Sequence, residues 1–288
     1  MTLGLFWREF RRNTVAVAAL AVVLLAITGA LLAPLLAPQN PYDLASIDLS
    51  DARRPPGSVG SEGQVYLLGT DAQGRDLFSA ILYGLRISIG IALLAGTVAV
   101  LIGSTLGLLA AFLRGISEAA IMRLVDLQLS VPAILMSMVL LAMFGPGQLQ
   151  LVCALALAQY AYFARTMHGA ASAERSKAYV EAALATPLPA RRVVLRHILP
   201  NCLPPLIVVA TMQIASAIGL EATLSFLGLG LPPTEPSLGT LIANGYQFLL
   251  SGRYWISIYP GIALITLIVS VNLVGDQVRD QLNPRLQR

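Results

Sequence analysis

The run ISIGIALLAGTVAVLIGSTLGLLAAFL, Ile87 to Leu113, contains no charged residue. A helix that crosses the hydrocarbon core of a bilayer needs about 20 apolar residues, so this run is long enough to span a membrane. Similar blocks occur at Val15 to Leu36, at Leu127 to Leu151 and on to Ala164, at Leu203 to Leu220, and at Ile256 to Gly275. The FGPGQ sequence at Phe144 to Gln148 divides the third block with a tight turn. The pattern predicts an all-α integral membrane protein with six transmembrane helices.

Charged residues make up only 12% of the chain, and their placement predicts its orientation. If the N-terminus is cytoplasmic, fourteen basic residues fall inside: Arg8, Arg11, Arg12, Arg114, Arg123, Arg165, Arg175, Lys177, Arg191, Arg192, Arg196, Arg279, Arg285 and Arg288. Five fall outside: Arg53, Arg54, Arg75, Arg86 and Arg253. Since cytoplasmic loops are enriched in Lys and Arg, both termini are expected in the cytoplasm. This bias accounts for the net charge of +4, so the charge gives no reason to expect a nucleic-acid partner, and the apolar blocks are expected to contact the lipid bilayer.

The hydrophilic segments predict a single transmembrane domain, residues 1–288, with an outer loop at 37–86 and a cytoplasmic loop at 167–202. The outer loop is too short for a nucleotide-binding domain, and the chain has no G-x-x-x-x-G-K-[ST] pattern. No arrangement of Ser, His, Asp or Cys is typical of a catalytic or metal site. We therefore expect no enzymatic activity and no cofactor or metal in this chain.

Small residues recur every four positions in the block that ends at Leu113. They are Ala95, Ala99, Gly103, Gly107 and Ala111. Such a ridge lets another helix approach closely, and small residues at this spacing are a common way for membrane helices to associate. The partner helix could belong to this chain or to a second subunit.

Two carboxylates, Asp126 and Glu221, lie nearest to membrane depth. Acidic residues inside a membrane often mark proton or substrate sites, but both residues lie near predicted span ends, which favours structural roles at the interface.

The outer loop ends in LGTDAQGRDLFSAILYGLRISI, Leu68 to Ile89. Asp71 and Asp76 have the chemistry of turns and helix N-caps, and apolar residues follow at four-residue intervals from Leu77 to Ile89. The spacing predicts an amphipathic helix on the outer surface that leads into the second span.

The cytoplasmic loop contains YVEAALATPLPARRVVLRHILPN, Tyr179 to Asn201. Good helix formers up to Ala185 predict one short helix. Thr186 as N-cap and Pro187 at the first helical position predict a second helix, which is expected to stop near Pro200. The pair could dock into a groove on a cytoplasmic partner, or it could be a solvated amphipathic connector.

This stretch resembles the EAA loop of binding-protein-dependent ABC importer permeases. Together with Leu68 to Ile89, EATLSFLGLGLPPTEPSLGTLI (Glu221 to Ile242) and the tail NLVGDQVRDQLNPRL, it resembles the C-type permease subunit of dipeptide, oligopeptide and nickel importers. The similarity covers nearly the whole chain in the family's order. It departs from the family at Pro187, which stands where the family has a glycine, so the coupling bend must be made another way.

The resemblance implies a type I importer, in which two related permeases form one pathway, two ATPase subunits hold ATP and Mg, and an extracytoplasmic solute-binding protein delivers substrate. In such importers the EAA loop rests in a cleft of the ATPase. The residues that this implies for coupling are Tyr179, Glu181, Ala182, Ala183, Thr186, Pro187, Arg191, Arg192, Arg196, Ile198, Leu199 and Pro200.

Peptides are the expected cargo, and nickel chelates, glutathione and other small solutes are the alternatives. A proton-coupled secondary transporter using Asp126 or Glu221 is a competing hypothesis, which broken spans in two repeated halves would favour, and the sequence indicates neither broken spans nor a repeat. A purely structural membrane scaffold would leave the loop motifs unexplained.

Overall fold

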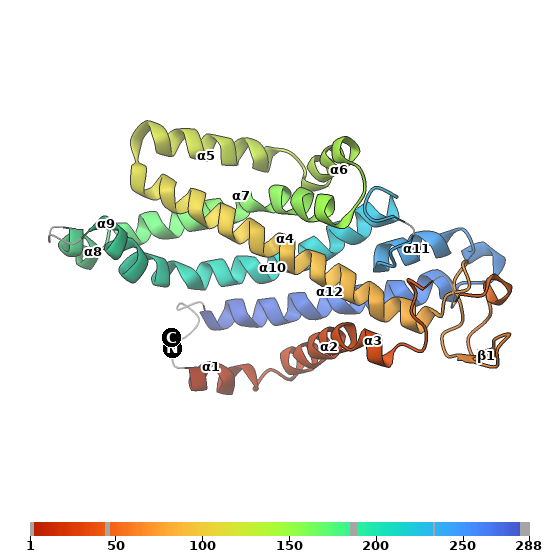
Figure 1. Ribbon diagram of the computed structural model, residues 1–288. Helices are drawn as coiled ribbons and strands as arrows, with labels where there is room; N and C mark the ends of the chain where they lie inside the picture. Colours follow the sequence, from red (N-terminus) through yellow and green to blue (C-terminus); the bar gives the residue numbers. More distant parts are fainter. Residues whose placement is uncertain (1–2, 44–46, 185–188, 233, 283–288) are drawn as a thin grey trace.

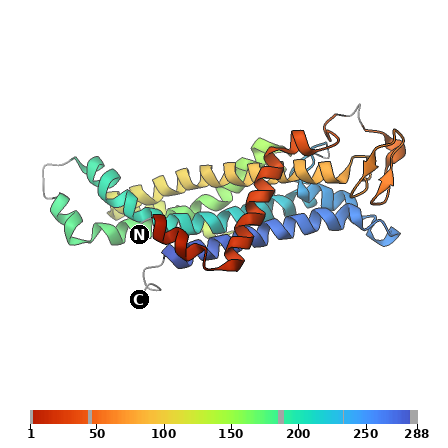
Figure 2. The ribbon, with the colours of Figure 1, turned by 90° about the horizontal axis from the view of Figure 1, so that it is seen from below.

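Long helices lie side by side in the computed structural model, which describes residues 3–43, 47–184, 189–232 and 234–282. Figure 1 shows most of them running along one axis, with shorter helices along one side and short elements at both ends, and Figure 2 shows that the long helix nearest the N-terminus lies obliquely across the others. The long helices are α2 (Thr14–Leu31), α4 (Leu77–Leu113), α7 (Gln148–Arg175), α10 (Leu199–Phe226) and α12 (Trp255–Leu282). Their exposed surfaces carry many large apolar side chains, as a lipid environment requires.

The helix α4 begins at an N-cap that the sequence predicts. One carboxylate oxygen of Asp76 accepts hydrogen bonds from the backbone nitrogen and the hydroxyl of Ser79, at 2.8 and 2.6 Å. From Leu77 the helix continues without a break to Leu113. The predicted amphipathic surface helix is therefore not a separate element. Leu77, Ile81 and Leu85 are buried because other helices cover the start of α4.

The predicted third span is not one straight helix. The chain forms α5 (Gly115–Ser130) and α6 (Ala133–Phe144), which meet at a bend of 91°. Pro132 explains the break, because a residue that precedes proline is pushed out of the α region, and Val131 is extended with φ −94° and ψ 129°. The predicted turn after Phe144 is present, with Gly145 at φ 81°.

Four helical stretches of the described residues are long and apolar enough to cross a membrane: α2, α4, Arg191–Phe226 and α12. If the bent pair of α5 and α6 is counted as one span, the described residues contain five candidate spans. The helix α7 lies beside α4 but falls outside this group on composition, because polar residues such as Gln159 and Arg165 interrupt it. The count of six spans therefore stays a prediction.

Elements from both halves of the chain share one end of the bundle. Figure 2 shows α1 (Leu3–Phe10) and the end of α12 in the half of the bundle that also holds α8 (Ala178–Leu184) and α9 (Ala190–Val193). This arrangement agrees with the even number of crossings that the sequence predicts. The outer loop lies at the opposite end, with α3 (Ala33–Leu36), α11 (Leu238–Tyr246) and η4 (Leu249–Ser251).

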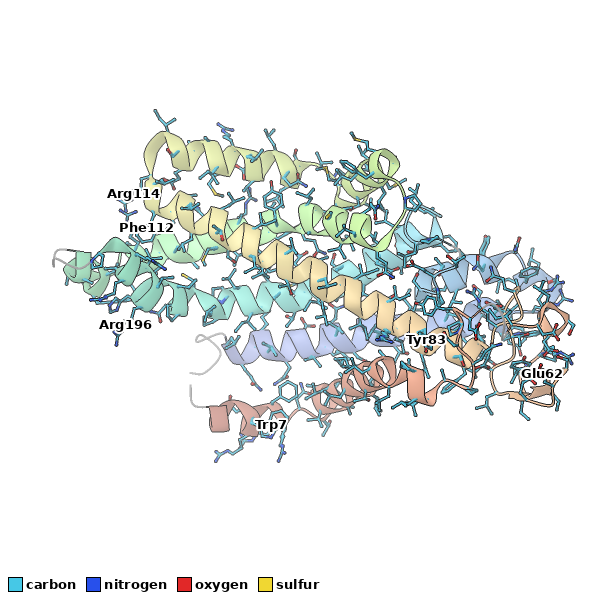
Figure 3. The ribbon with its side chains drawn as sticks, in the orientation of Figure 1. Trp7, Glu62, Tyr83, Phe112, Arg114 and Arg196 are labelled. Carbon is cyan, nitrogen blue, oxygen red and sulfur yellow. The ribbon has the colours of Figure 1, made fainter. Side chains whose placement is uncertain are left out.

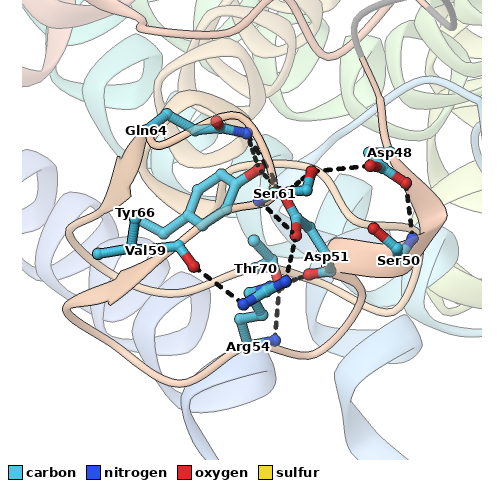
Figure 4. Close-up of polar contacts among 9 residues, drawn as sticks. All are labelled: Asp48, Ser50, Asp51, Arg54, Val59, Ser61, Gln64, Tyr66 and Thr70. Carbon is cyan, nitrogen blue, oxygen red and sulfur yellow. Dashed lines mark hydrogen bonds and ion pairs between the residues drawn. The ribbon is translucent and has the colours of Figure 1, made fainter.

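The outer loop is folded around one buried carboxylate. It contains the 3-10 turn η2 (Leu49–Asp51) and a short antiparallel hairpin of β1 (Ser58–Val59) and β2 (Val65–Tyr66). Asp51 accepts from the Ser61 backbone nitrogen at 3.0 Å and the Tyr66 hydroxyl at 2.9 Å, and it pairs with Arg54 at 2.7 Å (Figure 4). Burial by itself would raise the pKa of Asp51, but these hydrogen bonds outweigh it and hold the pKa below its ordinary value.

Candidate functional site

The candidate coupling segment, residues 167–202, forms one end of the bundle. After α7 the chain turns at Ser176 and enters α8, and after α9 it continues through the π-helical turn η3 (Val194–Ile198) into α10. The predicted stop near Pro200 is wrong, because η3 runs directly into α10 and Pro200 lies in the first turn of that helix. Proline is accommodated there next to the π-helical turn, in which the backbone N–H of Leu199 bonds to the Val194 carbonyl five residues back.

Predicted coupling residues occupy two different faces of this segment. Tyr179, Ala182, Arg191, Arg192, Arg196 and Pro200 are exposed, Ala183 and Leu199 are half-buried, and Ile198 is fully buried. Thr186 and Pro187 lie outside the described residues, and so does the side chain of Glu181. Figure 3 shows Arg196 projecting outward at this end of the bundle. The exposed face is basic and carries small residues on α8, which suits contact with another protein.

The opposite face belongs to the main hydrophobic core. Val180, Val193 and Ile198 have no exposed surface, and they pack in one cluster with residues of α4 and α7 such as Ala111 and Met167. An amphipathic connector would also bury this apolar face, so the two hypotheses differ in what contacts the exposed face. Here one face is anchored, so a displacement of α8 must involve the helices beneath it.

A polar network fixes the same segment to α7 and α10. Glu174, 7% exposed, accepts hydrogen bonds from the Tyr179 hydroxyl and, at 2.6 Å, from the Lys177 ammonium. Asn201 donates to the Tyr179 hydroxyl at 3.0 Å and to the His197 carbonyl at 2.7 Å. Burial by itself would raise the pKa of Glu174, but the hydrogen bonds from Lys177 and Tyr179 hold it below its ordinary value. The network joins the end of α7, α8, η3 and the start of α10.

Arg175 connects this end of α7 to the end of α4. One terminal nitrogen of its guanidinium donates to the carbonyl oxygens of Ala111 and Phe112, at 2.8 and 3.0 Å. The guanidinium also lies over the Phe112 ring, 5.0 Å from the centroid. The last carbonyls of a helix lack partners within it, and a cation there interacts favourably with the helix dipole. The sequence predicts Arg175 only as one of the cytoplasmic basic residues.

The ridge of small residues on α4 lies against α7 of the same chain. Ala95, Ala99 and Ala111 are buried. A Cβ atom added at Gly103 would lie 2.2 Å from the Tyr160 carbonyl oxygen, and one at Gly107 would lie 2.2 Å from that of Ala164. Since real Cβ atoms do not approach so closely, the two backbones meet at a distance that only glycine allows. Of the two possible partners, the structure therefore selects an intramolecular one.

The two membrane-depth carboxylates are in different environments. Asp126 on α5 forms an ion pair with Arg165 on α7, and both side chains are about half exposed. Glu221 on α10 is fully buried and accepts hydrogen bonds from Ser88 at 2.6 Å and Ser225 at 2.8 Å. Glu221 thus connects α10 to α4 in the interior, and it does not lie at a span end exposed to the interface.

Comparisons with known proteins match nearly the whole chain. Residues 103–288 match the model of the binding-protein-dependent transport system inner membrane component family, and residues 2–56 match the N-terminal TM domain of oligopeptide transport permease C. The chain is similar to the di/tripeptide transport system permease protein DppC of Pseudomonas aeruginosa, with 36% identity over 98% of this chain and 92% of the relative. It is also similar to DppC of Haemophilus influenzae, a dipeptide transport system permease, with 34% identity over 98% and 95%.

Two further similarities concern cargo and fold. The glutathione transport system permease protein GsiD of Pectobacterium atrosepticum is 35% identical over 98% of this chain and 91% of its own length. Among solved structures, a chain of the inward-facing MetNI methionine ABC transporter matches with a TM-score of 0.57 and 19% identity, over 71% of this chain and 96% of that chain. At that identity the match shows a shared fold.

Proposed function

The chain belongs to the family of binding-protein-dependent transport system inner membrane components, and we propose that it is one of two related permeases in an ATP-driven importer of di- or oligopeptides. Its place is the inner membrane, as the family description states. The observation that carries the peptide proposal is the identity of about a third with dipeptide and di/tripeptide permeases over almost the full chain.

Glutathione is the second candidate cargo, because a glutathione permease is similar over the same length. The two cargoes share peptide chemistry, since glutathione is itself a tripeptide. The test is to purify the intact complex with its binding protein and to identify the co-purified ligand by mass spectrometry. Di- or oligopeptides are the expected result, whereas a nickel chelate or another non-peptide solute would contradict the proposal.

The chain contributes no covalent chemistry to this transport. ATP and Mg are held and used by two partner ATPase subunits, and a solute-binding protein delivers cargo from outside. ATP binding can shift the permease between two conformations only because the ATP-bound ATPase subunits bind one of these conformations more tightly than the other.

Coupling to the ATPase runs through the exposed face of residues 167–202. The basic side chains Arg191, Arg192 and Arg196 offer charge-assisted contacts to a partner, and the exposed Ala182 permits close approach. The buried Val180, Val193 and Ile198 attach this face to the core beneath it. A partner that displaces α8 therefore also displaces the ends of α4 and α7.

Proton-coupled transport is the competing mechanism. Asp126 is already paired with Arg165, which favours a structural role for that carboxylate. Uptake by membrane vesicles separates the two mechanisms: it should require ATP and persist when an uncoupler removes the proton gradient. Uptake that survives ATP depletion and stops with the uncoupler would overturn the importer proposal.

A further inference from the structure

Arg75 is a buried arginine in the outer loop, just before α4. Its side chain is 2% exposed, and its Nε donates to a carboxylate oxygen of Asp71 at 2.7 Å. Asp71 is itself 1% exposed, and its other oxygen accepts from the backbone nitrogens of Gln73 and Arg75, at 2.8 and 3.0 Å. The turn before α4 therefore holds both the carboxylate and the guanidinium in a fixed position.

The guanidinium has hydrogen-bonding capacity that this pair does not use. Its Nη2 is buried and has no hydrogen-bond partner within the described part of the chain. Leaving a buried charged donor unsatisfied is costly, and most buried polar groups in proteins are paired. Arg54 in the same loop uses both of its terminal nitrogens, which bond to Asp51 at 2.7 Å and to the Val59 carbonyl at 2.9 Å, although its buried Nε also has no partner among the described residues.

Arg75 also lines a cavity of about 620 Å³ at the outer end of the molecule. Tyr42, Leu49 and Gln73 of the outer loop form one part of its wall, and Thr234 and Glu235, from the stretch before α11, form another. This volume lies in the range of about 300–1,000 Å³ that is usual for small-molecule sites. The wall thus combines apolar surface with one cationic and one anionic side chain.

We propose that this cavity binds a small zwitterionic solute, with Arg75 holding its free carboxylate and Glu235 its ammonium group. The proposal rests on the proposed function in taking this solute to be a peptide. An arginine fork matches a carboxylate, to which it can donate two parallel hydrogen bonds, and it stays charged at any physiological pH.

The position of Glu235 completes the match to a zwitterion. One of its oxygens accepts from the Gln148 amide at 2.8 Å, which fixes the carboxylate to the start of α7. The Asp71 carboxylate neutralises the charge of Arg75, so Arg75 offers a ligand carboxylate its unused N–H donors, while Glu235 offers an ammonium group a negative charge. The two residues together are complementary to the two termini of a short peptide. Either residue alone would select only one terminus.

The test measures equilibrium binding to the full chain, purified with its partner permease and ATPases and without the binding protein. The probes are Ala-Ala, its C-terminal amide and N-acetylalanine. Ala-Ala should bind at least about tenfold more tightly than the amide, because a hydrogen bond to a charged group is worth about 1.5 kcal/mol or more. Equal affinity for the acid and the amide would overturn the carboxylate assignment.

Substitutions at Arg75 test the residue directly. Arg75→Lys keeps a cation beside Asp71 but lacks the fork, and it should weaken Ala-Ala binding at least about tenfold. The double variant Asp71→Asn with Arg75→Gln should do the same and leaves no buried charge unpaired. Arg53→Gln is the control, since Arg53 is exposed in the same loop and does not line the cavity. Wild-type affinity in either Arg75 variant would contradict the proposal.

Glu235→Gln tests the site without disturbing the buried pair. It should weaken binding of Ala-Ala, which has an ammonium group, and leave binding of N-acetylalanine unchanged or tighter. Equal weakening of both probes, or of neither, would contradict the proposal. The transport assay tests the proposed function separately. A complex that imports no peptide but binds N-acetylalanine through Arg75 would contradict peptide import and still support the carboxylate site.

Discussion

Arg175, the last residue of α7, donates a hydrogen bond of 2.8 Å to the carbonyl oxygen of Ala111, near the end of α4. This contact closes the α4–α7 pair at the end of the bundle that carries the candidate coupling segment. Farther along, the same two helices meet backbone to backbone at Gly103 and Gly107. The two helices are therefore in contact at several positions along their length. A displacement of α8 is transmitted to both of them.

Removing the Arg175 contact should loosen this end of the bundle. Arg175→Leu leaves the last carbonyls of α4 without their donor, and we expect a loss of about 1.5–3 kcal/mol of stability, the usual worth of hydrogen bonds to charged groups. Arg175→Lys keeps the charge and one donor and should lose less. Thermal unfolding of the purified complex measures both. An unchanged midpoint in Arg175→Leu would show that the contact contributes nothing.

The glycine ridge allows a matched comparison within one helix. Gly103→Ala places a methyl group against the Tyr160 carbonyl and should destabilise the fold by about 1–3 kcal/mol or more, as overpacking does. Gly90, also on α4, has open space around its added Cβ, so Gly90→Ala should be neutral or stabilise by up to about 1 kcal/mol. The yield of folded, assembled complex in detergent gives the readout. Similar yields for the two variants would contradict close α4–α7 packing.

The outer loop should lose order in acid because of Asp51. Its pKa is lowered in the folded protein, so its carboxylate contributes stability above the unfolded pKa of about 4, and this contribution is lost as pH falls through the lower folded value. Hydrogen exchange of residues 48–70, corrected for its intrinsic pH dependence, should therefore accelerate below about pH 4. Asp51→Asn should reduce this pH dependence and leave the part due to Asp48, whose pKa is also lowered by hydrogen bonds from Ser50 and Ser61. An unchanged response in that variant would assign the effect to another group.

The predicted orientation can be tested with single cysteines at the two ends. Cys202 is buried, so it is a poor probe, while Cys153 is exposed and is replaced by serine. Glu62→Cys, in the outer loop, should react with an impermeant thiol reagent added to intact cells. Arg196→Cys should react only in inside-out vesicles. Figure 3 shows these positions at opposite ends of the molecule. Labelling of Arg196→Cys by a reagent added to intact cells would contradict the predicted orientation.

The sequence was sufficient to predict the features that depend on local chemistry. The apolar blocks, the Asp76 cap and the turn at Gly145 each follow from residues a few positions apart. Pro132 is a local signal for the break, because the residue before a proline is pushed out of the α region. The residues on both sides are uniformly apolar, however, so the hydrophobic pattern alone predicts one continuous span.

Features that depend on distant residues could not be read in the same way. Arg175 meets Ala111 across two helices, and Glu221 meets Ser88 across 133 positions, so no periodicity signals either contact. The Asp51 centre depends on how a loop folds back on itself. The continuous run through Pro200 does not follow from the sequence, because proline ordinarily ends a helix and the π-helical turn η3 that precedes it has no signal in the local pattern.

The central claim is that the exposed face of α8 transmits motion between the ATPases and the spans. Ala182→Trp adds bulk to this face, and Glu181→Lys reverses a charge in the same helix. Ala120→Trp on the exposed surface of α5 is the matched control for bulk. Pro187→Gly restores the family residue and should be tolerated with at most a modest loss of rigidity.

The deciding measurement is substrate-stimulated ATP hydrolysis by the reconstituted complex, with uptake and subunit assembly measured on the same samples. Ala182→Trp and Glu181→Lys should assemble with intact spans yet lose at least about tenfold of the stimulated rate, which corresponds to about 1.4 kcal/mol of coupling. Ala120→Trp should retain the wild-type rate. Normal stimulation and normal uptake in both α8 variants would contradict the claim, because a solvated connector tolerates such changes within about 0.5 kcal/mol.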